Sequence, residues 1–500
     1  MQSSWPPRGI ELLYHYSDER MENLTDHGGG ASTLKIARIE LHGLFGLYTH
    51  VVQLHVSDRV TIIHGPNGVG KTVLLRLIEG LFHGRYLLLW KTVYRSFSVT
   101  FTNGTCITVD RLQQPRLVET PGELQPEDIV LRISYADERP HIWKNEPTEL
   151  AALAQRVNAE VPWITRVGPD VWEDDRTGVR YSSSELITQF GDILPEHLRD
   201  LVFREPEWLA RLRQRAPVHL VETQRLLRTP DLDETRYSRR GREAVLASTV
   251  KSYARALHRL IADNLALYGK QSQSLDQTFP QRMLDPTLGS LEVSELKTRM
   301  SKLDEKRREL KRIGLIEDDL PSPFNIDALD SANPTQLTVM TLYVQDTAAK
   351  LGTLEDLARR VILLLDNINK KFKHKSIDVN RSTGLVAYDR AGDKLDLDAL
   401  SSGEQHEIVL MYDLLFRVRP NTLVLIDEPE LSLHVTWQKA FLRDLLGIVA
   451  AANFDVILAT HSPFVVGDRS DLAIALVPDL DRDFVIEPQD ELFDSEDKTN

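Results

Sequence analysis

The sequence has a single cysteine, no long apolar run and fewer basic than acidic side chains. One cysteine, Cys106, excludes an intramolecular disulfide framework and a cysteine-rich zinc module, and it is typical of a protein of the reducing cytosol. No apolar stretch reaches the about 18–20 residues that span a bilayer, and the N-terminus lacks the basic-then-apolar pattern of a signal peptide. These absences predict a cytoplasmic protein without a membrane partner.

The charge balance restricts what the surface can bind. The chain carries 60 basic and 74 acidic side chains, a formal net charge of −14, so the surface as a whole repels nucleic acid. Any phosphate-binding surface must therefore be a local basic patch. The 42% of hydrophobic and 27% of charged residues are otherwise the balance of an ordinary globular protein.

Apolar periodicity divides the 500 residues into strand-rich and helical stretches. Asn103-Gly104 between two alternating runs predicts a β-hairpin. Leu354, Leu357, Val361, Leu364, Ile368 and Phe372 recur at helical spacing and predict one amphipathic helix face. The expected organisation is a flexible leader at 1–33, a β/α part at 34–234 with helical decoration at 141–216, a helical insertion or arm at 235–372, a second β/α part at 373–485 and an acidic tail at 486–500.

A phosphate-binding loop is the strongest chemical signal. Gly65-Pro66-Asn67-Gly68-Val69-Gly70-Lys71-Thr72 follows the predicted strand Val60–His64 and opens a predicted helix. The glycines let backbone N–H groups turn around phosphate oxygens, and the helix N-terminus adds a favourable dipole. Lys71 is expected to reach the β- and γ-phosphates of ATP, and the Thr72 hydroxyl is expected to bind Mg²⁺.

A second element follows another apolar run. Leu423–Ile426 predicts a buried parallel strand whose end delivers Asp427 and Glu428 to the edge of the sheet where ligands bind. Asp427 is expected to hold Mg²⁺ through water. Glu428 is expected to polarise the attacking water as general base or orienting group.

Three further segments make the pattern specific. Leu400-Ser401-Ser402-Gly403-Glu404-Gln405 resembles the signature motif of ABC-type ATPases, in the form used by the soluble OLD, RecF and SMC-like members. Glu430-Leu-Ser-Leu-His434 stands where this family has its D-loop, and His461 matches its switch histidine. Gln224 is the candidate for the Q-loop glutamine. The resemblance implies an α/β fold: an ABC-type P-loop ATPase head, a mixed sheet with flanking helices, split by a helical insertion.

The resemblance also implies how the site works. Such ATPases pair head to tail, so Ser401, Ser402 and Gly403 of one copy would complete the γ-phosphate cage of ATP held by the other. The resemblance does not decide whether pairs assemble into higher oligomers. His461 would contact the γ-phosphate, and Gln224 would join Thr72 and Asp427 around Mg²⁺. Two segments depart from the family's pattern. Ser402 replaces a glycine of the signature motif, and the N-terminal strand-turn His42–Gly46 lacks the basic residue that RecF- and OLD-like chains commonly carry there.

Basic residues gather in three clusters, whose members are Arg211, Arg213, Arg215, Arg225, Arg228, Arg236, Arg239, Arg240 and Arg242; Lys306, Arg307, Arg308, Lys311 and Arg312; and Lys370, Lys371, Lys373 and Lys375. In SMC-like relatives such surfaces bind double-stranded DNA through phosphates. Because Glu243, Glu305 and Glu309 are interleaved, salt-bridged helix faces are an equal alternative.

Several functions fit these motifs. The first is a nucleotide-driven sensor that controls a separate effector, as in the ATPase components of bacterial anti-phage systems of the PARIS or Septu type. This choice rests on the OLD-like signature, the short insert and the lack of a nuclease constellation, since the sequence after His461 is too short for the Toprim domain of OLD nucleases. The alternatives are a RecF- or SMC-like ATPase that acts on DNA, and a scaffold that uses ATP with little turnover.

Overall fold

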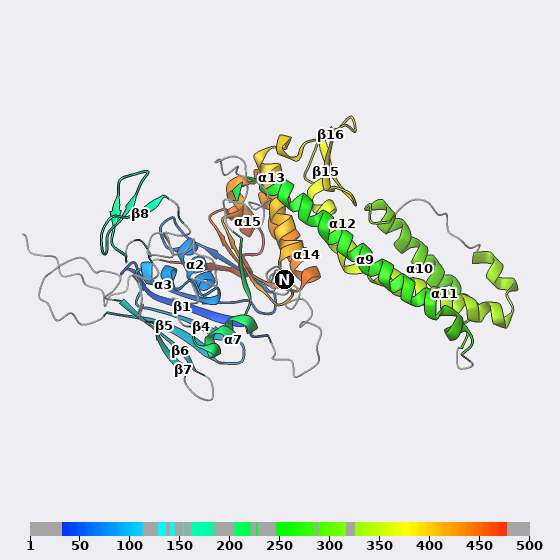
Figure 1. Cartoon of the computed structure of the whole chain (residues 1–500), viewed down its shortest axis with the longest axis horizontal. Coiled ribbons are helices and arrows are strands. Elements are labelled where there is room, and N and C mark those ends of the chain that lie inside the picture. The colour runs from blue at the N-terminus through cyan, green and yellow to red at the C-terminus, as the bar shows by residue number, and fades with distance from the viewer. Residues whose placement is uncertain are drawn as a thin grey trace, which may run out of the picture.

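The computed structural model describes residues 33–113, 129–136, 141–145, 163–183, 205–221, 227–228, 247–285, 289–316 and 326–477, with the single residues 154, 161 and 186. The molecule is elongated, with a head built around two sheets and a helical arm that projects from it (Figure 1). The α/β class predicted from the sequence is confirmed.

The parallel sheet lies at the centre of the head. Its strand order is β11-β17-β18-β3-β19, and every adjacent pair is parallel. All five residues of β17 are buried, as the continuous apolar run predicted. The five strands are β3 (Val60–His64), β11 (Val218–Val221), β17 (Leu423–Asp427), β18 (Asp455–Thr460) and β19 (Ala473–Ala475).

An antiparallel sheet packs on the other side of α2 (Lys71–Phe82), the helix that follows the phosphate-binding loop (Figure 1). Its order is β2-β1-β4-β5-β6-β7, and the predicted Asn103-Gly104 turn joins β4 to β5. Apolar residues of α2 and both sheets form one core. The strands are β1 (Ile36–Leu44), β2 (Tyr48–Gln53), β4 (Ser96–Phe101), β5 (Cys106–Gln113), β6 (Ile129–Ala136) and β7 (His141–Asn145).

The helical interpretation of residues 141–216 is wrong for most of the described part. Among the described residues, β7 extends the antiparallel sheet at its edge and three short strands form a separate sheet, whereas α7 (Glu207–Arg215) and the residues 154, 183 and 186 are helical. Such short strands are set by their pairing partners and turns and not by a pattern of their own. The separate sheet consists of β8 (Ile164–Arg166), β9 (Trp172–Asp174) and β10 (Arg180–Tyr181).

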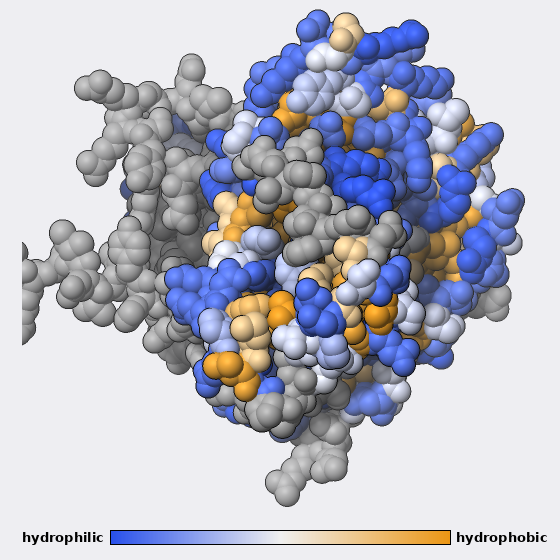
Figure 2. Space-filling model, turned by 90° about the vertical axis from the view of Figure 1, so that its right-hand side faces the viewer, coloured by the Kyte–Doolittle hydropathy of each residue, from blue (hydrophilic) through white to orange (hydrophobic). Residues whose placement is uncertain are grey.

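The expected insertion is mainly helical where the structure describes it, apart from the short strand β13 (Ala247–Ser248) at its start. Helices α9 (Thr249–Met283), α10 (Val293–Arg312) and α11 (Pro334–Gly352) run along the arm, and α12 (Glu355–Asn369) returns to the head (Figure 1). All six residues of the predicted amphipathic face of α12 and its flanks are buried. The end of the molecule seen in Figure 2 is largely hydrophilic, with hydrophobic side chains in small groups.

The second β/α part completes the head after the arm. A small antiparallel sheet packs on α12 and α9, and the helix of the signature segment follows it. The remaining elements are α3 (Tyr86–Lys91), β12 (Leu227–Arg228), β13 (Ala247–Ser248), β14 (Lys375–Asn380), β15 (Gly384–Asp389), β16 (Lys394–Leu395), α13 (Ser402–Tyr412), the π-helical turn Asp413–Arg417, α14 (Val435–Ala452), α15 (Pro463–Val466) and the 3-10 turns Ile326–Ser331, Leu397–Ala399, Pro429–Ser432 and Ser470–Leu472.

Candidate active site

The phosphate-binding loop joins β3 to α2 as the sequence predicted. Gly68 and Gly70 have φ angles of 83° and 94°, a region that glycine adopts without strain. At Gly70, the N-cap of α2, a Cβ would also lie 2.3 Å from Leu44 Cδ2, so a larger residue would force the buried Leu44 side chain to move. The loop therefore ends at the N-terminus of a 12-residue helix, the arrangement that favours bound phosphate.

The Lys71 side chain bonds back to the loop that precedes it. Its Nζ donates to the carbonyl oxygens of Gly65 at 2.9 Å and Pro66 at 3.0 Å. Burial lowers the pKa of Lys71, and the nearby carboxylates of Glu428, Asp427 and Glu430 oppose that shift. The side chain thus places a cation beside the phosphate-binding loop and among the acids that follow β17.

Asp427 meets Thr72 across the sheet edge. The Thr72 hydroxyl donates to Asp427 Oδ1 at 3.1 Å, although 355 positions separate the two residues. A hydroxyl and a carboxylate oxygen brought together beside a phosphate-binding loop are the hard oxygen ligands that Mg²⁺ takes. These two residues fit the predicted metal site. No cluster of three or more His, Cys, Asp or Glu suited to a metal occurs among the described residues.

Glu428 and His461 form the third pair. The ring Nε2 of His461 lies 2.9 Å from Glu428 Oε1, and its Nδ1 lies 3.3 Å from Lys71 Nζ. Glu428 has a φ of 42°, a left-handed conformation that costs a non-glycine residue of order 1–3 kcal/mol. Such strain is found where the surrounding structure fixes a functional side chain.

The signature segment forms a capped helix start that does not bond to the phosphate-binding loop of the same chain among the described residues. Ser401 caps α13 in a capping box with Glu404, whose carboxylate accepts from Ser401 N at 2.7 Å and from Lys375 Nζ at 2.8 Å. Burial alone would raise the pKa of Glu404, but the hydrogen bonds from Lys375 and Ser401 outweigh it and lower the pKa. Within the described residues, no hydrogen bond or ion pair joins Ser401, Ser402 or Gly403 to the phosphate-binding loop of the same chain.

Two residues of the site have contacts that the sequence did not predict, and a third, predicted residue lies outside the described ranges. His50 is buried, and its Nε2 lies 2.7 Å from the Val69 carbonyl oxygen, but a lone histidine in a strand carries no signal. Glu430 binds the His461 segment, a contact that its place in the predicted D-loop does not indicate. Gln224 lies outside the described residues, so its Q-loop assignment stays a prediction.

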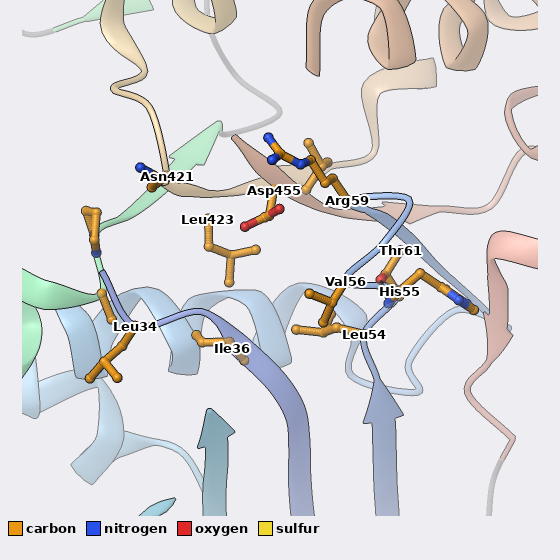
Figure 3. Close-up of a pocket in the computed structure, with 13 residues that line it drawn as sticks. Leu34, Ile36, Leu54, His55, Val56, Arg59, Thr61, Asn421, Leu423 and Asp455 are labelled. Atoms are coloured by element: carbon orange, nitrogen blue, oxygen red, sulfur yellow. Dashed lines mark hydrogen bonds between the residues drawn. The ribbon is translucent and has the colours of Figure 1, made fainter. Parts of the chain in front are cut away.

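The opposite edge of the parallel sheet holds no comparable site among the described residues. A cavity there is lined mainly by apolar residues such as Leu34, Leu54 and Leu423, and Asp455, which pairs with Lys35 at 3.0 Å, also lines it (Figure 3). Its volume of about 20 Å³ is room for about one water molecule. This edge therefore offers no room for a nucleotide, in contrast to the edge where β3, β17 and β18 end.

Comparison with known proteins agrees with this geometry. A family described as "AAA domain, putative AbiEii toxin, Type IV TA system" matches residues 60–467, from β3 to the end of α15. The chain belongs to this AAA-domain family. It is thus an ATPase-class protein with a phosphate-binding loop, and the matched range includes every predicted site residue.

Two other likenesses are weaker. Protein ea59 of Escherichia phage lambda is 42% identical over 66 residues, which is 13% of this chain and 13% of the phage protein. The Smc head domain of Pyrococcus furiosus, solved with the C-terminal domain of ScpA, has a TM-score of 0.32 at 13% identity, over 89% of this chain and 94% of that one. The SMC head domain of Thermotoga maritima has a TM-score of 0.30 at 11% identity, over 87% and 92%.

None of the helices that the structure describes combines the length and the apolar character needed to cross a membrane.

The buried His50 predicts a pH dependence. Burial lowers the pKa of His50, and its hydrogen bond to Val69 only partly opposes this shift. The unfolded chain therefore binds a proton at His50 more readily, so the free energy of unfolding should decrease as the pH falls below about 6.5. Thermal unfolding of His50→Gln, which keeps an amide donor and does not titrate, should lack that part of the decrease. An identical pH profile in both proteins would contradict the assignment.

Proposed function

We propose that this chain hydrolyses ATP in a magnesium-dependent reaction and uses the cycle as a conformational switch. The observation that supports this most directly is the convergence of three distant segments. Thr72 bonds to Asp427, and His461 lies between Lys71 and Glu428, so a phosphate-binding loop, two acids and a histidine share one sheet edge.

The residues divide the chemistry among themselves. Gly65 to Thr72 would hold the phosphates through backbone N–H groups and Lys71. Thr72 and Asp427 would hold Mg²⁺, which supplies charge neutralisation at the phosphates. Glu428 orients a water molecule and accepts its proton, and His461 donates toward the terminal phosphate. Gln224 completes the proposed metal site. Positioning of the reactants and electrostatic stabilisation of the transition state provide most of the rate enhancement in such a reaction.

A second copy of the chain would complete the site. Ser401 and Ser402 are exposed at the N-terminus of the signature helix and, among the described residues, make no hydrogen bond to their own phosphate-binding loop. Apolar side chains beside the acids and the histidine are exposed as well, among them Leu431 at 65% and Phe464 at 45%. Two copies arranged head to tail would cover these side chains and bring each signature segment, with Gly403, to the other copy's ATP.

The partner we favour is a protein effector in anti-phage defence, with a nuclease as the leading class. The description of the matching family names a toxin–antitoxin system, in which two different components act together. Part of the positive charge of the basic clusters is neutralised where the structure describes them: Lys306 pairs with Glu355, Arg307 with Asp304, Lys371 with Asp444 and Lys375 with Glu404. This pairing supports a protein partner over DNA.

A RecF- or SMC-like ATPase that acts on double-stranded DNA is the second candidate. Lys373 and His374 favour it, because both are exposed and line a pocket of about 480 Å³ that also includes Ser401 and Gly403. A DNA phosphate bound by Lys373 would lie next to the signature segment, so DNA binding there would be coupled to binding of the nucleotide.

ATP turnover by the purified chain, with and without duplex DNA, tests both candidates. Turnover above that of Glu428→Gln and indifferent to DNA is the expected result, and it would direct the search to protein partners. Strong stimulation by DNA would put the second candidate first. Turnover no greater than that of Glu428→Gln would overturn the proposed hydrolysis.

A further inference from the structure

Glu430 lies in the 3-10 turn Pro429–Ser432, which follows Asp427 at the end of β17 and Glu428 after it. Its Oε1 accepts three hydrogen bonds from the segment that carries the histidine. The donors are the Thr460 hydroxyl at 2.7 Å, the His461 N–H at 2.6 Å and the Ser462 N–H at 3.1 Å. One carboxylate oxygen thus binds three consecutive residues at the end of β18.

A second side chain fixes the position of Glu430 itself. Gln438 on α14 donates through Nε2 to the carbonyl oxygens of Glu430 at 3.3 Å and Leu433 at 3.0 Å. Its Oε1 accepts from the Ser462 hydroxyl at 2.8 Å. The turn after β17 and the turn after β18 are therefore tied together at both the side chain and the backbone of Glu430.

These contacts determine where the histidine ring lies. His461 follows β18 immediately, and its ring bridges Lys71 and Glu428 at distances of 3.3 and 2.9 Å. Bonds from N–H groups to a carboxylate are charge-assisted and hold geometry more tightly than neutral hydrogen bonds. Among the described residues, Glu430 makes no hydrogen bond to the phosphate-binding loop; its carboxylate acts on Lys71 by charge alone, and its hydrogen bonds reach the site through the His461 segment.

We propose that Glu430 is a positioning residue for His461, which holds the histidine at the distance from Lys71 and Glu428 that turnover requires. This inference rests on the proposed ATP hydrolysis. A small displacement is enough to matter, because a reacting group that shifts by about 1 Å can lower a rate about 100-fold. Glu430 therefore affects the chemical step more than nucleotide binding, which depends on the loop from Gly65 to Thr72.

The central experiment is a double-mutant cycle on steady-state ATP hydrolysis. Glu430→Ala should lower kcat about 10- to 100-fold with a change in KM below about 3-fold. In a His461→Ala background, the same substitution should change kcat by less than about 2-fold, because the two residues act as one unit. Full, independent losses from both substitutions would overturn the proposal.

The conservative variant separates positioning from stability. Glu430 Oε2 is buried without a hydrogen-bond partner among the described residues, so the anchoring runs through Oε1 alone. Glu430→Gln keeps one amide oxygen to accept from the same donors and should restore most of the turnover that Glu430→Ala loses. Glu79→Gln is the matched control, since it removes the charge of another carboxylate, one that pairs with Arg85 at 2.9 Å. It should leave kcat unchanged. Equal losses in Glu430→Gln and Glu430→Ala would contradict a role through Oε1.

Hydrogen exchange without nucleotide tests these Glu430 contacts independently of hydrolysis. The amides of His461 and Ser462 should exchange faster in Glu430→Ala and at the normal rate in Glu79→Gln. If exchange rises as expected but the unsubstituted chain does not hydrolyse ATP, the proposed function fails while the anchoring by Glu430 stands. Unchanged exchange would refute that anchoring whatever the turnover.

Discussion

The Glu428→Gln variant is expected to bind ATP with nearly unchanged affinity and to hydrolyse it about 10²–10⁴ times more slowly than the unsubstituted chain. The amide is close in size and shape to the carboxylate, so the lost capacity is the acceptance of a proton from water. The left-handed backbone at Glu428 and the 2.9 Å contact to His461 Nε2 fix this side chain at the sheet edge. A group held so firmly is suited to orienting one water molecule.

The same variant should accumulate an ATP-bound pair of chains. If hydrolysis separates two copies that share nucleotide, a chain that binds but does not hydrolyse ATP stays associated. Light scattering with ATP and Mg²⁺ should therefore show a larger mass for Glu428→Gln than for the control Glu79→Gln, which should cycle normally. A variant that hydrolyses ATP at the ordinary rate would disprove the role assigned to Glu428.

The part of the site that the sequence predicts is the part set by local pattern. Val60–His64 and Leu423–Ile426 are buried apolar runs that end in chemically distinctive residues, and parallel pairing forces such ends to one edge. The proximity of Thr72 and Asp427 therefore follows from the order of motifs along the chain. The helix face from Leu354 to Phe372 is predictable for a similar reason, because its spacing alone determines which residues are buried.

The missed parts depend on contacts that no local pattern encodes. Glu430 accepts from a segment 30 or more positions away, and its place in the predicted D-loop does not indicate that contact. The strands between 141 and 181 are only two to five residues long and exist because of their partners. The π-helical turn Asp413–Arg417 is similar, since it contacts Tyr253 on α9: the Tyr253 hydroxyl donates to Asp413 and accepts from Arg417.

Lys71→Ala is expected to abolish measurable ATP binding and, with it, hydrolysis. Charge-assisted hydrogen bonds to phosphate contribute about 1.5–3 kcal/mol each, so the loss of two would weaken affinity by at least about 100-fold. The side chain is only 4% exposed and lies among Asp427, Glu428 and Glu430. Its removal would leave the acids without their nearest cation, and their repulsion of phosphate would add to the loss.

Titration with a fluorescent ATP analogue measures this effect directly. Lys35→Ala is the matched control, because it removes a lysine that pairs with Asp455 at 3.0 Å on the opposite edge of the sheet. That variant should bind nucleotide normally. Normal affinity in Lys71→Ala would refute the phosphate-binding loop itself, and every role proposed for Thr72, Asp427, Glu428 and His461 would then lose its basis, since each is defined by its distance from that loop.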